Sequence, residues 1–395
     1  MAVRTPGEKM IPFPLKHAPA SPYDLPLKSF RIVKTLKEQR LIYDLQLVCR
    51  EWRQIALDVL YEIIHLSSTQ IERDRSGRFR TESLLRTLQD SKDADMSYQV
   101  GYGRWVKQLT LDIHHCPIHP VKRIISLCPN LETLIMRKGR DWSRKQIDTN
   151  LREVLPKCRS LRRFEWLGVS CTRADSTAMS AGLGTLLQTC TSLRALTINC
   201  VNTEPRNPVP LHMPNLLELN LMDAHRETLV ALAKWTLPSL THLSIECCRN
   251  LFKAELKAIA QHFGSHLLFL SLRSNCHLHH GELAFMDYIM DEYVRACPRL
   301  QILVLPSEKS LRIVPSTQRS LTITHIILEP YYTWDQLAHV MRRILAYDLP
   351  ALRCIWVLNG WDLRQPNSSR FEHACRARQI RVEDENGVDL LEIWR

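Results

Sequence analysis

The sequence predicts an α/β solenoid, a curved stack of about ten irregular strand-and-helix repeats, preceded by a small all-helical module. Three observations predict it. An apolar frame recurs ten times between residues 106 and 357. Apolar residues in the segment 45–60 recur at spacings of three and four, as on one face of a helix. The length of 395 residues suits one elongated repeat array with an appendage.

The composition is that of a folded protein without a membrane span. It has 45% hydrophobic and 24% charged residues, and no stretch approaches the ~20 apolar residues that a span needs. The 13 cysteines are scattered and the Pro-rich first residues lack an apolar signal sequence, so we expect reduced thiols in the cytoplasm or nucleus. The net charge of +12 has both signs interspersed, which predicts weak attraction to polyanions and identifies no nucleic-acid site.

Changes in the pattern divide the chain into five regions. Thr81–Asp90 opens with a Thr-Glu cap and carries three leucines at helical spacing, which predicts a short helix between the first module and the array. The regions are a flexible Pro-rich tail (1–24), the helical module (25–66), a linker with the short helix (67–104), the repeat array (105–380) and a C-terminal tail or cap (381–395).

The repeated frame is an apolar residue, two variable residues, an apolar residue, one variable residue and an apolar residue. The last two apolar positions alternate, so both point to one face of a short strand, while the first tucks in beneath it. One such unit cannot bury its own apolar face, but stacked copies share a continuous core. The ten frames begin at Val106, Leu131, Leu161, Leu193, Leu216, Leu240, Leu267, Leu300, Ile323 and Leu352.

Cysteine and asparagine recur at fixed distances from this frame. Cys248 and Asn275 stand eight residues after their leading Leu, where they can satisfy backbone groups of a turn. With these positions the array resembles leucine-rich repeats of the longer, cysteine-containing helical class. Unequal spacing predicts extra residues on the helical side and in loops such as Asn202–Met213. Four further cysteines stand three residues before a leading Leu, where a helix is expected to end against the strand: Cys128, Cys158, Cys190 and Cys297.

The helical module begins with Leu-Pro and continues with a Val-Cys-basic-x-Trp helix, a pattern that resembles an F-box. Pro26 suits the first helical turn because its φ is fixed and its missing N–H is not needed there. An F-box followed by leucine-rich repeats is the order in a large class of substrate receptors, abundant in fungi, and the segment Cys375–Glu385 is similar to their closing strand. The resemblance implies that the module binds the Skp-type adaptor of a cullin–RING ubiquitin ligase, through Leu25, Pro26, Leu45, Val48, Cys49 and Trp52.

The sequence offers no positive sign of catalysis, a metal or a cofactor. It lacks a Gly-x-Ser-x-Gly elbow, a phosphate-binding loop and a dinucleotide fingerprint. Two His/Cys clusters, around Cys116 and Cys276, have no second spaced pair of ligands nearby, so we expect polar turns there and not zinc. The prediction is a non-enzymatic protein without cofactor or metal.

Variable positions of the frames point away from the core, so they line up as a ladder on the concave face of the solenoid. The ladder mixes both charges with apolar residues, which suits a protein surface better than a uniform polyanion. The candidate substrate-binding residues are Arg137, Arg163, Glu165, Glu218, Asn220, Met222, Glu246, Arg273 and Trp356.

These features favour a non-catalytic substrate receptor of an SCF-type ubiquitin ligase, whose adaptor binds the helical module and whose protein substrate binds the array. The alternative is a leucine-rich-repeat interaction scaffold with no link to ubiquitin, in which residues 25–66 only cap the solenoid. A third reading is a basic repeat protein that binds RNA or chromatin; the net charge alone supports it.

Overall fold

The structure is a computed structural model, and the chain divides by its contacts into two units, Met1–Glu62 and Ile63–Arg395. Almost all described residues belong to the second unit; of the first, only residues 61–62 are described, so most of the F-box-like module lies outside the description. The described residues are 61–66, 80–94, 101–112, 118–138, 153, 155–168, 187–199, 210–247, 253–274, 293–305, 320–328, 340–342, 344–345, 348–358, 369–384, 387–388 and 390–393.

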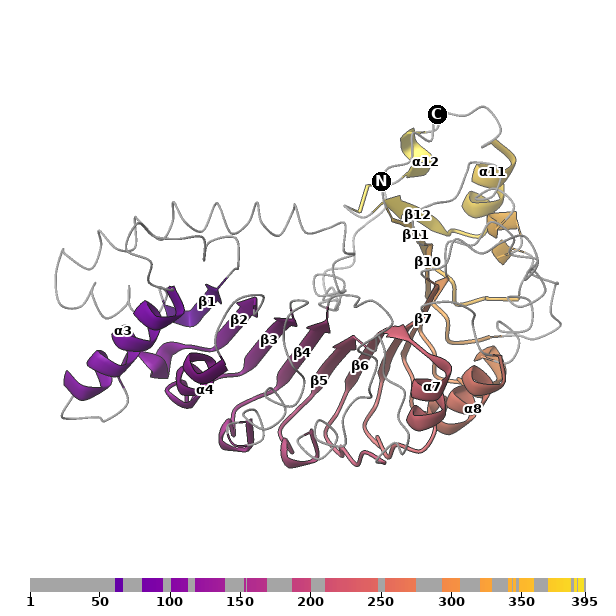
Figure 1. Cartoon of the computed structure of the whole chain (residues 1–395). Coiled ribbons are helices and arrows are strands. Elements are labelled where there is room, and N and C mark those ends of the chain that lie inside the picture. Colours follow the sequence, from indigo (N-terminus) through magenta and orange to yellow (C-terminus); the bar gives the residue numbers. More distant parts are fainter. Residues whose placement is uncertain are drawn as a thin grey trace. The chain divides into compact units, whose positions relative to one another are not determined.

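A single parallel sheet of 12 strands forms the second unit, and the strands lie in the order of the chain. Figure 1 shows them as one curved row, with α4, α7 and α8 on its outer side. The fold is therefore an α/β leucine-rich-repeat solenoid. The strands are β1 (Ile63–Leu66), β2 (Gln108–Asp112), β3 (Thr133–Lys138), β4 (Arg163–Gly168), β5 (Ala195–Asn199), β6 (Glu218–Ala224), β7 (His242–Cys247), β8 (Phe269–Ser274), β9 (Ile302–Leu305), β10 (His325–Leu328), β11 (Cys354–Val357) and β12 (Arg381–Asp384).

The ten apolar frames coincide with β2 to β11, and their apolar residues form the core. In the second frame Leu131 and Leu134 are fully buried and Met136 is 1% exposed. Trp166, which ends the third frame, is half-buried. The frame therefore predicts both the strands and their buried face.

The same hydrogen-bond arrangement is found at successive junctions between repeats. The carbonyl oxygen of Leu217 accepts the N–H groups of Thr241 (3.0 Å) and His242 (2.9 Å), the two residues that lead into the next strand. This double acceptor fixes how far one strand is shifted against its neighbour. The same arrangement recurs at the carbonyls of Lys107, Glu132, Arg162, Arg194, Thr241, Leu268, Gln301 and Thr324.

The four cysteines before leading leucines form a second repeated feature, a tight turn into the strand. The carbonyl oxygen of Cys158 accepts the N–H of Leu161 at 3.0 Å, and Cys128, Cys190 and Cys297 make the same bond to the Leu three residues on. Their side chains are buried and are in the thiol form. Burial raises the pKa of Cys128 and Cys297 to about 12 and that of Cys158 to about 11.

Short helices and turns return the chain to the start of the next strand. α8 packs against α7, and the side chain of Tyr293 donates a hydrogen bond to the carbonyl of Leu256 in α8 (3.0 Å). No helix among the described residues is long and apolar enough to cross a membrane. The described helices are α3 (Arg80–Ala94), η3 (Tyr102–Trp105), α4 (Ile118–Ser126), η4 (Leu155–Lys157), α7 (Arg226–Leu232), α8 (Lys253–Phe263), α11 (Ser369–Ala377) and α12 (Leu390–Ile393).

The start of the sheet differs from the sequence prediction. Ile63–Leu66 was expected to be the end of the helical module, but it forms β1, which pairs in parallel with β2. Two adjacent β-branched residues, followed by His and Leu, favour an extended chain, and Ile64 turns into the core. The predicted helix at Thr81–Asp90 is present as the longer α3, which packs against α4.

The end of the sheet agrees with the expected closing strand. Arg381–Asp384 forms β12, which pairs in parallel with β11, and α12 packs on β12. Only Val382 of this strand is fully buried. The first residues of the predicted C-terminal tail or cap therefore complete the sheet.

Truncating a core leucine tests the shared core. Leu243→Ala removes a side chain that is 0% exposed in β7, and should lower the free energy of unfolding by about 2–5 kcal/mol. Val230→Ala, at a position 41% exposed in α7, should change it by less than about 0.5 kcal/mol. Urea denaturation followed by circular dichroism measures both; equal effects would contradict a core at the frame positions.

The buried thiols give a second test. Because burial raises the pKa of Cys128, Cys158 and Cys297, these thiols should react with a thiol reagent at about pH 8 only after unfolding. Mass spectrometry of labelled peptides from native and urea-treated protein would show this. Rapid labelling of these three residues in the native protein would contradict their position in the core.

Candidate protein-binding surface

The concave face is the face of the sheet opposite the buried frame residues, and strand register arranges its side chains in rows. In the first row, Arg163, Ala195, Glu218 and His242 are consecutive register partners across β4 to β7. In the second row, Glu165 is followed by Thr197 and Asn220, two residues further along the same strands. The solenoid therefore places side chains from distant parts of the chain side by side.

All nine residues predicted for this face lie in strands, at positions between or beyond the buried frame residues. Arg163 and Glu218 are in the first row, and Glu165, Asn220 and Trp356 in the second. The remaining four lie one step further along the strands: Arg137 in β3, Met222 in β6, Glu246 in β7 and Arg273 in β8. Glu246 and Arg273 are direct register partners.

A bulge interrupts the rows between β6 and β7. The register shifts between Leu221 and Ala224, and Asp223 has a positive φ of 51°. Met222 keeps its register with Asn199 of β5, so the shift affects only the pairing of β6 with β7. A backbone bulge of this kind re-aims a side chain at the edge of a binding surface.

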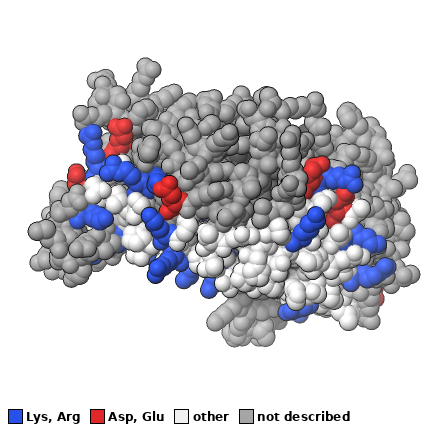
Figure 2. Space-filling model, turned by 60° about the horizontal axis from the view of Figure 1, so that its bottom comes forward, with Lys and Arg blue, Asp and Glu red and all other residues white. Residues whose placement is uncertain are grey.

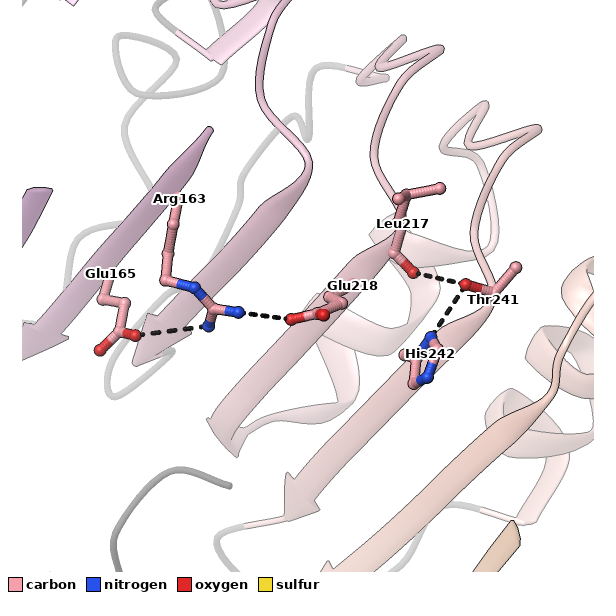
Figure 3. Close-up of polar contacts among 6 residues, drawn as sticks. All are labelled: Arg163, Glu165, Leu217, Glu218, Thr241 and His242. Carbon is pink, nitrogen blue, oxygen red and sulfur yellow. Dashed lines mark hydrogen bonds and ion pairs between the residues drawn. The ribbon is translucent and has the colours of Figure 1, made fainter. Parts of the chain in front are cut away.

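Arg163 joins two strands that are not neighbours. One of its guanidinium nitrogens lies 2.7 Å from a carboxylate oxygen of Glu218, and another lies 3.6 Å from Glu165 (Figure 3). Between them stands Ala195, whose small side chain lets the guanidinium reach across β5. Such partly exposed pairs add little to stability, about 0–1 kcal/mol, but they hold the charged groups in one arrangement.

His242 is held in a fixed orientation beside this cluster. The Thr241 hydroxyl donates to the carbonyl oxygen of Leu217 (3.2 Å) and lies 2.9 Å from His242 Nδ1 (Figure 3). Because the hydroxyl has one hydrogen, its oxygen accepts the Nδ1–H, and Nε2 is left as an acceptor. The ring stacks on Phe269, with 5.7 Å between ring centroids.

A second Thr-His pair repeats this arrangement three strands later. The Thr324 hydroxyl donates to the carbonyl of Gln301 (3.2 Å) and lies 2.8 Å from His325 Nδ1. The His325 ring lies 5.1 Å from that of Trp356. The sequence analysis did not predict either histidine as part of this surface, although the dipeptide Thr-His follows the leading apolar residue of two frames, Leu240 and Ile323.

Burial lowers the pKa of both histidines. For His242 the nearby Glu218 carboxylate opposes this effect without cancelling it. For His325 burial is again the main cause, Arg381 and Arg353 lower the pKa further, and Glu383 acts in the opposite direction. Both rings are therefore neutral at pH 7.

Trp356 is positioned by the closing strand. Its indole N–H donates to a carboxylate oxygen of Glu383 (2.8 Å), and Arg381 lies 3.0 Å from the other carboxylate oxygen. Neither Glu383 nor Arg381 was predicted as part of the surface. The indole remains partly exposed, with its polar edge satisfied and part of its apolar surface accessible.

Two of the sequence predictions lie largely outside the described residues. These are the six adaptor-binding candidates and most of both His/Cys clusters. Among the described residues, no three His, Cys, Asp or Glu side chains gather in a way that could hold a metal ion.

Remote structural similarity to known proteins is found. No protein-family model and no curated protein matches the chain. Among solved structures, a chain from the crystal structure of the yeast Rad7 and Elc1 complex is similar to it. The identity is 14%, the match covers 88% of this chain and 95% of that chain, and the TM-score is 0.36. The fold assignment therefore rests on the sheet of the chain itself.

The histidines predict a pH dependence of stability. Their folded pKa lies below the ordinary value of about 6.5, so below that pH the unfolded chain binds protons that the folded chain cannot. Stability should therefore fall as the pH is lowered from about 7.5 to 5.5. The double variant His242→Gln/His325→Gln should show a smaller fall in urea midpoint; an unchanged fall would contradict the lowered pKa.

Proposed function

We propose that the chain is a non-catalytic substrate-receptor subunit of a cullin–RING, SCF-type ubiquitin ligase. The residues 25–66 dock a Skp-type adaptor, and the concave face of the solenoid binds a protein substrate. The observation that carries the proposal is the concave face itself, where ionised, aromatic and apolar side chains are aligned in rows on one rigid sheet.

The composition of the concave face supports a protein ligand. Protein interfaces are enriched in aromatic residues, Met and Arg, and their strongest contributions come from side chains held in place before binding. Trp356 is held by Glu383, and Arg163 by two carboxylates. Ordering these side chains in advance lowers the entropy that binding costs.

The adaptor half of the proposal rests on the sequence. Leu25, Pro26, Leu45, Val48, Cys49 and Trp52 stand at the positions that the F-box pattern uses for adaptor contact. In this arrangement catalysis belongs to other subunits, so the chain contributes effective concentration and orientation of its substrate. The proposal includes no cofactor or metal and a cytoplasmic or nuclear location.

One observation favours the alternative function, a repeat scaffold without a link to ubiquitin. Tyr61 and Glu62 are helical and lead directly into β1, which pairs with β2. The end of the F-box-like segment is thus the first strand of the solenoid. A segment joined to the edge of the sheet in this way is suited to capping it.

Binding to an adaptor separates the two functions. A purified Skp-type adaptor should retain the full-length chain, and the variant Val48→Asp/Trp52→Ala should lose at least about 90% of that binding, because a charge and a cavity replace two contact side chains. The matched control Glu218→Lys/Trp356→Ala alters only the concave face and should bind the adaptor like the parent.

Circular dichroism must show that both variants are folded. No binding by the folded parent chain would overturn the receptor proposal and leave the scaffold. Equal loss in the concave control would mean that the adaptor contact is not in residues 25–66.

A further inference from the structure

The edge of the sheet where the strands begin forms a second surface, separate from the concave face. At each junction the residue after the leading apolar residue lies on this edge. In the first four frames these residues are Lys107, Glu132, Arg162 and Arg194. Lys107, Arg162 and Arg194 are exposed.

The backbone hydrogen bonds of the junctions place these residues side by side. The carbonyl of Lys107 accepts the N–H of Glu132 (2.8 Å), that of Glu132 accepts the N–H of Arg162 (2.8 Å), and that of Arg162 accepts the N–H of Arg194 (2.7 Å). Neighbouring strands lie about 4.8 Å apart, so the charged side chains of this edge are within reach of one ligand.

Two further cations extend the row. Arg159 is exposed and precedes Arg162 by three residues. Arg104 lies over the ring of Trp105, 4.3 Å from its centroid, and its carbonyl accepts a hydrogen bond from the Asn130 side chain (2.8 Å). We call the five cations the basic rim: Arg104, Lys107, Arg159, Arg162 and Arg194.

The positive charge is confined to part of the edge. From β6 to β10 the equivalent positions carry no charge, and charge returns with Arg353, which leads into β11. Figure 2, which brings this side of the molecule forward, shows Lys and Arg gathered toward the two ends and a largely uncharged stretch between them. The uncharged positions are Leu217, Thr241, Leu268, Gln301 and Thr324.

Three cations of the rim are not neutralised within the described part of the chain. No acidic side chain described there forms an ion pair with Arg159, Arg162 or Arg194. Lys122, in contrast, forms an ion pair with Glu153. Adjacent like charges repel, and an anionic ligand relieves that repulsion.

We propose that the basic rim binds an acidic polypeptide segment in extended conformation. Guanidinium groups match carboxylates with two parallel hydrogen bonds, and three of the arginines form no ion pair with an acidic side chain among the described residues. This site goes beyond the proposed receptor function, since it involves neither the adaptor-binding residues nor the concave face.

The acidic groups around the rim favour a polypeptide over a nucleic acid. Glu132 stands within the row, and Glu165 and Glu218 lie on the adjacent concave face. A nucleic acid carries a negatively charged phosphate at every nucleotide, and these phosphates would be repelled by the carboxylates. A polypeptide can place uncharged residues opposite them and its acidic residues opposite the arginines.

Fluorescence anisotropy with the full-length chain tests the site. The probes are a labelled peptide of alternating Glu and Gly and a labelled oligothymidine of equal length. The triple variant Arg159→Glu/Arg162→Glu/Arg194→Glu should weaken peptide binding at least about tenfold. The control Lys234→Glu/Arg295→Glu/Arg299→Glu makes the same charge change at exposed positions elsewhere and should bind like the parent.

Circular dichroism and a milder variant with Gln at the same three positions would separate loss of binding from loss of folding. The site is overturned if the parent does not bind the peptide, if the control loses as much affinity as the rim variant, or if oligothymidine binds more tightly than the peptide. Failure of adaptor binding would leave this result unaffected.

Discussion

The carbonyl that accepts two N–H groups at each junction is the constraint on which the rest of the structure depends. It recurs at the junctions from β2 to β11, and there it sets each strand in register with the one before it. Once the register is fixed, the frame residues face one shared core, and a repeat that could not fold alone is stabilised by its neighbours. The tight turns at the buried cysteines repeat with the same period and lead each chain segment into its strand.

Register also turns a one-dimensional sequence into rows of side chains. Arg163 and Glu218 are 55 residues apart in the chain, yet they form an ion pair because only Ala195 separates them in their row. In the two Thr-His pairs the threonine hydroxyl donates a hydrogen bond to the junction carbonyl. The imidazole rings are therefore oriented by the same group that aligns the strands. The basic rim arises in the same way on the adjacent edge. The surfaces therefore follow from the repeat geometry and from which residue occupies each repeated position.

The sequence predicted the solenoid because the frame carries its own physical reason, a buried alternating face. It missed β1 because Tyr61, Ile64 and Leu66 fit the frame but also fit the end of a helical module, and a single copy does not separate the two. β12 has polar residues where the frame requires apolar ones, and only its resemblance to a closing strand pointed to it. The pairing of Arg163 with Glu218, the bulge at Asp223 and the link from Trp356 to Glu383 depend on unequal repeat lengths and on side-chain reach, which the frame does not encode.

The central claim is that the chain joins an adaptor, held by its first module, to a ligand held by the solenoid. Hydrogen exchange of the full-length chain, followed peptide by peptide with and without a Skp-type adaptor, tests it most directly. The account predicts slower exchange in peptides covering residues 25–56 and unchanged exchange in β2 to β11. Slower exchange along the strands of the concave face, or no change anywhere at saturating adaptor, would contradict it.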